Sequence, residues 1–130
     1  MKNILTVEAF RQDKYIAELD EGGVLHKELE AKPFQLPVGA DVITLTIPRT
    51  GLPDTKENVI KCRAYISYDA GLNWEILIGF STCGGDIGNT ESGATIGLRQ
   101  PGNPDRRVKC TMIPLRDITA KLDVNVFSTK

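Results

Sequence analysis

The sequence predicts an all-β protein, folded as an antiparallel β-sandwich of about eight strands with a jelly-roll-like topology. Apolar and polar residues alternate with a period of two in several short segments, as they do in half-buried strands. Turn-forming residues separate these segments, and no segment has the pattern of a long helix. Because 130 residues are typical of one domain, two sheets packed face to face suit the chain better than one open sheet.

Each alternating segment is expected to place one face in an apolar core. The alternating segments are, in chain order, Leu5–Ala9, Ile43–Ile47, Ile60–Tyr68, Val108–Met112 and Ala120–Val126. Ile76–Phe80 is apolar on both faces and predicts a more central strand. Cys62 and Cys110 fall at inward positions, where a thiol usually packs as a small apolar group. The turn clusters between strands are Pro48–Asp54, Asp69–Gly71 and Pro101–Asp105.

Residues 13–32 fit two local structures. The sequence Glu21-Gly22-Gly23 suits the turn of a hairpin that joins Tyr15–Leu19 to Val24–Leu29. The Glu, Leu, Ala and Lys content of this region also suits a helix, but Gly22 and Gly23 would break a long helix at its centre. We therefore expect one domain over residues 1–130, with residues 1–36 as an N-terminal arm or hairpin.

An immunoglobulin-like sandwich is the second choice of topology. Immunoglobulin domains carry a tryptophan between two bridged cysteines. Trp74 does lie between Cys62 and Cys83, but these cysteines are too close in sequence for the usual bridge between sheets. The jelly-roll topology is therefore preferred.

Composition excludes several classes of function. Lysine and arginine number 16 against 17 acidic residues, so the chain lacks the basic footprint of a general nucleic-acid binder. No apolar run is long enough to cross a membrane or to form a secretory leader, so we expect cytoplasmic synthesis without a signal peptide. Three cysteines and one histidine, His26, offer neither a disulfide framework nor a metal site. We expect no metal and no cofactor.

One short motif stands out between two predicted strands. Ser67, Asp69, Gly71 and Trp74 match S-x-D-x-G-x-x-W. The motif resembles the Asp-box of sialidases and other β-proteins, in which it is a folding element away from the active site. The resemblance implies a structural hairpin: Asp69 accepts hydrogen bonds from the turn, Gly71 supplies a positive φ, and Trp74 tucks its ring under the hairpin. It does not imply sialidase activity.

Other sequence patterns lack the residues that a phosphate-binding or catalytic site would need. Gly84–Gly88 looks like a phosphate loop, but no Gly-Lys-Ser/Thr sequence follows it. The carboxylate pairs lie in the densely charged first 32 residues, where a solvated face is expected. The residues most suited to contact a partner lie in the charge-poor, glycine-rich stretch Thr82–Leu98, which is expected to be a long loop, and around the Pro101–Asp105 turn. They are Asp86, Asn89, Arg99, Asn103, Arg106 and Arg107.

These observations favour a non-catalytic structural or interaction protein that docks through loops and edge strands onto other proteins or copies of itself. In size and strand pattern the chain resembles the small β-sandwich accessory proteins of phage virions, such as capsid decoration, neck or tail components. That resemblance implies contact regions at Thr82–Leu98 and before Pro37, and a virion location. The alternative is a carbohydrate-binding module, which would bind polysaccharide through exposed aromatics such as Tyr65. A cupin enzyme needs several histidines and is excluded.

Overall fold

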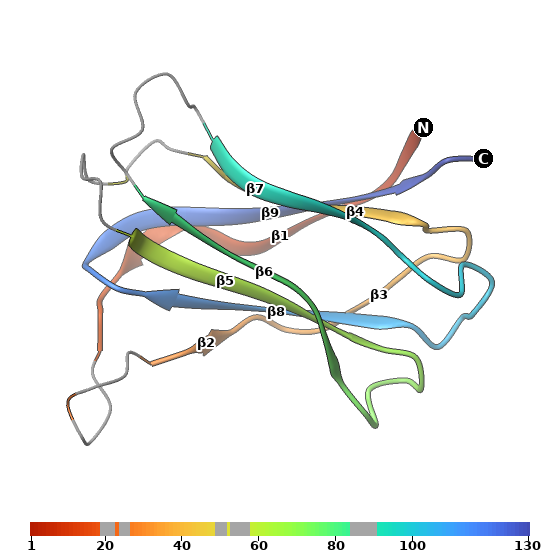
Figure 1. Ribbon diagram of the computed structural model, residues 1–130, viewed down its shortest axis with the longest axis horizontal. Helices are drawn as coiled ribbons and strands as arrows, with labels where there is room; N and C mark the ends of the chain where they lie inside the picture. The colour runs from red at the N-terminus through yellow and green to blue at the C-terminus, as the bar shows by residue number, and fades with distance from the viewer. Residues whose placement is uncertain (19–22, 24–26, 49–51, 53–57, 84–90) are drawn as a thin grey trace.

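The chain folds into two antiparallel β-sheets packed face to face (Figure 1), which confirms the predicted all-β sandwich. The computed structural model describes residues 1–18, 23, 27–48, 52, 58–83 and 91–130. The strands in these residues are β1 (Lys2–Tyr15), β2 (Leu29–Glu30), β3 (Phe34–Gln35), β4 (Val42–Pro48), β5 (Asn58–Ser67), β6 (Glu75–Cys83), β7 (Glu91–Gly97), β8 (Arg107–Pro114) and β9 (Ile118–Ser128).

The strand order is that of a jelly roll. One sheet has the order β1-β9-β4-β7, and the other has the order β2-β8-β5-β6, with β3 also pairing with β8. Since β2 and β3 lie along the same neighbour, they act as one interrupted strand, and the two sheets then hold four strand positions each. The chain passes repeatedly from one sheet to the other, as in a double-sheet jelly roll. The predicted topology and the number of strands are confirmed.

The core consists of the inward residues that the alternation predicted. In β4 the side chains of Ile43, Leu45 and Ile47 are fully buried. The other inward rows are Ile60, Cys62, Ala64 and Ile66 of β5; Val108, Cys110 and Met112 of β8; and Ala120, Leu122, Val124 and Val126 of β9, all buried. The polar residues between them face outward, so the two sheets share a single apolar layer.

The N-terminal region belongs to both sheets and does not stand apart as an arm. β1 pairs antiparallel with β9, from Lys2 opposite Ser128 to Tyr15 opposite Ile118. A register shift between Glu8 and Phe10 changes which side chains face inward. Phe10 is therefore buried in the core, and Ala9, which the alternation placed inward, is only half-buried. Glu21 and Gly22 of the predicted hairpin turn, and His26, lie outside the described residues.

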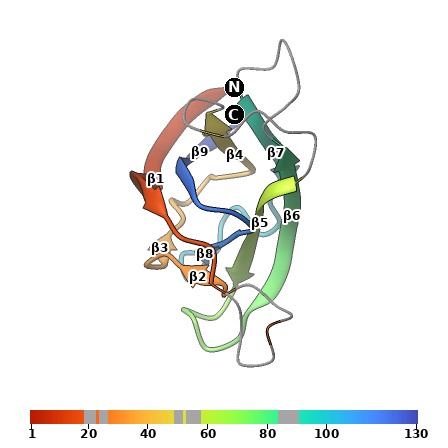
Figure 2. The ribbon, with the colours of Figure 1, turned by 90° about the vertical axis from the view of Figure 1, so that its left-hand side faces the viewer.

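Two predictions for the middle of the chain are wrong. β6, expected to be central, lies at the edge of its sheet with β5 as its only ladder partner in the described structure. The stretch Thr82–Leu98, expected to be a long loop, contains β7, which pairs with β4. Figure 2 shows β6 and β7 along one side of the sandwich and β1 along the other.

Candidate functional site

The turn between β5 and β6 is built by the Asp-box-like residues. The Ser67 hydroxyl is buried; it accepts hydrogen bonds from the Gly71 N–H at 2.8 Å and the Asp69 N–H at 3.3 Å, and donates to Asp69 Oδ1 at 2.7 Å. Ala70 and Gly71 follow with φ values of 60° and 92°. A glycine at the second position relieves the steric cost of two consecutive left-handed residues. These three motif residues therefore form a structural turn.

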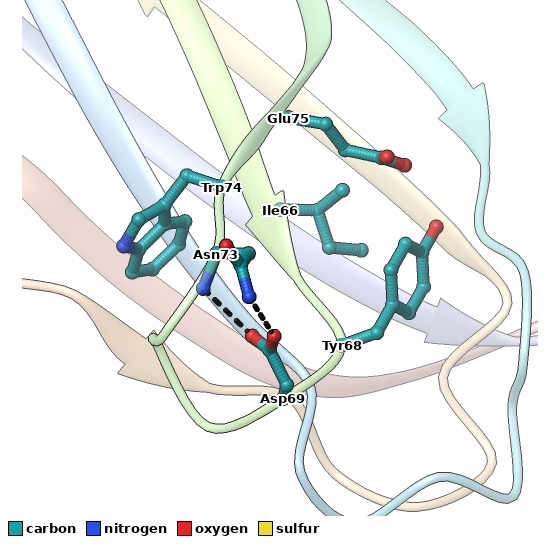
Figure 3. Close-up of a pocket in the computed structure, with 6 residues that line it drawn as sticks. All are labelled: Ile66, Tyr68, Asp69, Asn73, Trp74 and Glu75. Atoms are coloured by element: carbon teal, nitrogen blue, oxygen red, sulfur yellow. Dashed lines mark hydrogen bonds between the residues drawn. The ribbon is translucent and has the colours of Figure 1, made fainter.

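The Asp69 carboxylate is fixed by a residue outside the motif. Asn73 donates its backbone N–H to Oδ1 at 2.9 Å and its side-chain amide to Oδ2 at 2.6 Å (Figure 3). Hydrogen bonds from Asn73 and Ser67 lower the pKa of Asp69 from 3.8 to about 2. Asn73 was missed at the sequence level, although its place four residues after Asp69 allows such a turn to close.

Replacing Asp69 with asparagine is expected to change how stability depends on pH. The pKa of the folded state lies below the ordinary 3.8, so the ionised carboxylate stabilises the fold well above that pH, and this stabilisation is lost as the pH falls from about 4 to about 2. Urea midpoints of the wild type and Asp69→Asn should differ near neutral pH and converge in that acidic range. A gap that stays constant down to pH 2 would contradict the role given to the carboxylate.

Trp74 lies at the end of the outer sheet face and is half-buried. Its ring packs against the turn, since a Cβ on Gly71 would lie 3.6 Å from the indole Cζ2. The Lys109 Nζ lies 4.9 Å from the centre of the Trp74 ring and 5.3 Å from that of Tyr65. The same ammonium lies 3.6 Å from Glu30. One cation therefore covers a face of both rings.

We expect Trp74→Ala to lower the free energy of unfolding by about 1–2 kcal/mol, less than the loss of a fully buried ring. Trp74→Phe, which keeps an aromatic ring against the turn and under Lys109, should lose less than half of that. Because Trp74 is the only tryptophan, unfolding must be followed by circular dichroism. A loss above about 3 kcal/mol would mean that the ring is a core residue.

The structure brings the second predicted cluster, around Pro101–Asp105, against this turn. The Ala70 N–H donates to the carbonyl of Asp105 at 2.9 Å, and the Asn103 amide donates to the carbonyl of Tyr68 at 3.0 Å. Arg99 is exposed, lies over the Tyr68 ring at 5.5 Å and pairs with Glu75 at 2.9 Å. Asn103 thus helps to join the β5–β6 turn to the Pro101–Asp105 turn. Arg99 lies on the exposed surface of this joint.

Arg106, predicted to contact a partner, is instead a core residue. Its side chain is 0% exposed, and its guanidinium donates to five backbone carbonyls. The acceptors are Asn103 at 3.3 Å, Ala40 at 2.8 Å, Arg99 at 3.1 Å, and Pro37 and Pro101 at 3.2 Å each. Burial lowers the pKa of Arg106. These five carbonyls form a cage around the guanidinium, called the carbonyl cage below, which links the 36–41 turn to the 99–106 turn. The prediction that Arg106 contacts a partner is therefore wrong.

The remaining predicted residues divide between surface and undescribed segments. Arg107 is half-exposed and donates to the carbonyls of Pro104 and Arg106. Asp86 and Asn89 lie outside the described residues. The hollow lined by Ile66, Tyr68, Asp69, Asn73, Trp74 and Glu75 (Figure 3) measures about 160 Å³. That volume is below the ~300 Å³ at which small-molecule sites begin.

Within the described ranges, no three His, Cys, Asp or Glu residues gather in a way that could hold a metal ion. The same residues contain no helix long and apolar enough to span a bilayer.

The four sheet edges differ in how they are protected against pairing with another strand. β1 carries five charged residues, Lys2, Glu8, Arg11, Asp13 and Lys14, and has three register shifts. β2 and β3 are two residues long each. β6 has no charged residue after Glu75, and β7 has none after Glu91. Charges, irregularities and shortness are the usual protection of an edge, so the β6–β7 side is the less protected one.

The exposed apolar side chains extend this contrast. Ile76 on β6 is 67% exposed, and Leu72 at the preceding turn is 81% exposed. Leu77, Ile78 and Phe80 are half-buried against the core. The feature that distinguishes this chain is therefore an apolar strand placed at an edge.

Comparisons with known proteins assign the chain to no family. No protein-family model matches the chain, and no curated protein matches it significantly. Two solved structures are similar at 12% identity: infectious bursal disease virus Gx strain, with 97% of this chain covered and a TM-score of 0.39, and Gt strain, with 94% covered and a TM-score of 0.42. The chain spans about a third of those chains, 33% and 31%. The jelly-roll assignment accordingly stands on strand order.

Proposed function

We propose that this chain is a non-catalytic structural or interaction protein that docks onto other proteins through its β6–β7 side. One observation carries the proposal. β6 has the apolar character of a central strand but lies at the edge, and packing within a single copy covers Leu77, Ile78 and Phe80 only in part and leaves Ile76 67% exposed. An edge strand that is apolar and free of charge is a template for pairing with another chain.

The end loops supply a second contact surface. Arg99 is exposed beside the β5–β6 turn, and Arg107 is half-exposed on the neighbouring strand. The carbonyl cage around Arg106 holds the 36–41 and 99–106 turns in a fixed arrangement. A rigid end that presents cations suits an acidic partner surface and needs little ordering on binding.

The setting that we propose is a phage virion, with the chain as a capsid decoration, neck or tail accessory protein. The jelly roll occurs in viral capsid proteins and also in lectins. Fold alone does not decide between these classes. The less protected β6–β7 side, which suits assembly with other proteins, supports the proposal of a virion component.

The carbohydrate-binding alternative is less well supported. Sugar binding needs aromatic faces that are free to stack, but Lys109 covers one face of both Tyr65 and Trp74. The Tyr65 hydroxyl is also engaged, since it donates to Glu28 at 3.3 Å. Glu28 accepts a further hydrogen bond from Thr111 at 2.6 Å, so this part of the face is an internally satisfied network.

Two measurements test the proposed function. Mass spectrometry of purified virus particles from the source should find the chain at a fixed ratio to the major shell protein. Electrophoresis through gels containing soluble polysaccharides should leave the mobility of the chain unchanged. Retardation by a polysaccharide that Tyr65→Ala abolishes, together with absence of the chain from particles, would overturn the proposal in favour of the carbohydrate module.

A further inference from the structure

The β6 edge contains a regular segment that is suited to accept another strand. From Ile78 to Thr82, β6 pairs with β5 without interruption, and a register shift flanks this segment at each end. None of its five residues is charged or a proline. The backbone groups on its outer side have no ladder partner in the described part of the chain. A short, regular and uncharged segment is what β-strand addition requires.

We infer that the strand added to β6 is β6 of a second copy, paired antiparallel about a two-fold axis. This inference rests on the proposed function and names its partner. An antiparallel pair of identical strands is self-complementary, because residue i faces j and residue j faces i. The sheet β2-β8-β5-β6 would then continue into the same sheet of the second copy. β6 would become a central strand, which is the position that its sequence predicts.

The distribution of charge permits this pairing only on the β6–β7 side. Glu75 is the one charged residue of β6 and lies at its first position, so antiparallel pairing places the two Glu75 residues at opposite ends. β7 lies on the same side and is uncharged from Ser92 to Gly97. A copy approaching β1 would instead meet a strand with charges of both signs and three register shifts.

The outer face of β6 offers positions where a charge can be added without disturbing the fold. Gly79 lies opposite Arg63, and Ser81 lies opposite Lys61. A Cβ on Gly79 would make only ordinary contacts, 3.5 Å from the Arg63 Cγ and from the Cys62 carbonyl oxygen. Lys61, Arg63, Gly79 and Ser81 line a surface hollow of about 270 Å³, which has room for a carboxylate side chain. Glutamate at either position would face a cation within its own chain.

The test is the oligomeric state of the full chain, measured by sedimentation velocity over a wide concentration range. The wild type should form a dimer. Gly79→Glu and Ser81→Glu should each raise the dimer dissociation constant about tenfold or more, because like charges from the two copies meet near the axis. Gln12→Glu adds the same charge on exposed β1 and should leave the dimer intact. Urea midpoints measured at a concentration where every variant and the wild type are monomeric should show that all fold with the same stability.

Hydrogen exchange gives an independent readout. The amides of Ile78–Thr82 should be protected in the wild-type dimer and should exchange faster in Ser81→Glu, whereas those of β9 should be unaffected. A wild type that stays monomeric, or a dimer that both β6 variants leave intact, would overturn self-pairing. Either result leaves the proposed function standing if the chain is found in particles, since the same edge could accept a strand of another protein.

Discussion

Arg106→Met is expected to lower the free energy of unfolding by about 3–5 kcal/mol, the largest effect of any single substitution that we predict. Methionine fills much of the same space but donates no hydrogen bond. The five carbonyls that face the guanidinium would lose their donor in a buried setting, and the 36–41 and 99–106 turns would lose their link. Urea denaturation followed by circular dichroism measures the loss.

Neighbouring Arg107 provides the matched control for this substitution. It carries the same charge but is half-exposed and reaches two carbonyls, so Arg107→Met should cost no more than about 1 kcal/mol. Arg106→Lys keeps the charge and loses the planar fork of donors. Its loss of stability should therefore lie between those of Arg107→Met and Arg106→Met. Equal losses for Arg106→Met and Arg107→Met would contradict the carbonyl cage.

Gly93→Ala is expected to cost about 2–3 kcal/mol and to weaken the pairing of β7 with β4. A Cβ on Gly93 would overlap the carbonyl oxygen of Leu45 on the adjacent strand. The obstacle is backbone, so no side-chain rotation can relieve it, and β7 must shift. Urea denaturation gives the stability change, and hydrogen exchange of the β7 amides shows whether the strand has moved away.

Gly97→Ala, in the same strand, separates this effect from the general cost of adding a methyl group. A Cβ there would meet only the Asp41 carbonyl oxygen, at 3.8 Å, which is an ordinary contact. We expect a change within about 0.5 kcal/mol. If Gly97→Ala were as destabilising as Gly93→Ala, the close approach of β7 to β4 would not be the cause.

Alternation predicted the core because it reports directly which side chains are buried. The rows through Ile43–Ile47 and Ala120–Val126 are inward as expected, since a period of two leaves one face of each strand apolar. It could not predict Phe10, because the register shift in β1 changes the phase of the pattern without a signal in the sequence. It also could not place β6, because an apolar composition does not report whether a strand lies at the centre or at the edge of its sheet.

The carbonyl cage could have been predicted from the same pattern. Arg106 is in phase with Val108, Cys110 and Met112, so alternation places its side chain inward, whereas Arg107 alternates outward. Their shared charge instead predicts one surface cluster, which is wrong for Arg106. The joint between the two turns, in contrast, joins residues about 35 positions apart, such as Asn103 and Tyr68, and no local signal reports that contact.

The pairing of β1 with β9 has a consequence for the order of folding. In the described structure β1 is an edge strand whose ladder partner is β9, more than a hundred residues later in the sequence. During synthesis the native ladder of β1 therefore cannot form until residues 118–128 have left the ribosome. Contacts of such long sequence separation slow folding. The charges along β1, which guard its edge in the finished protein, would protect the nascent chain from aggregation during that interval.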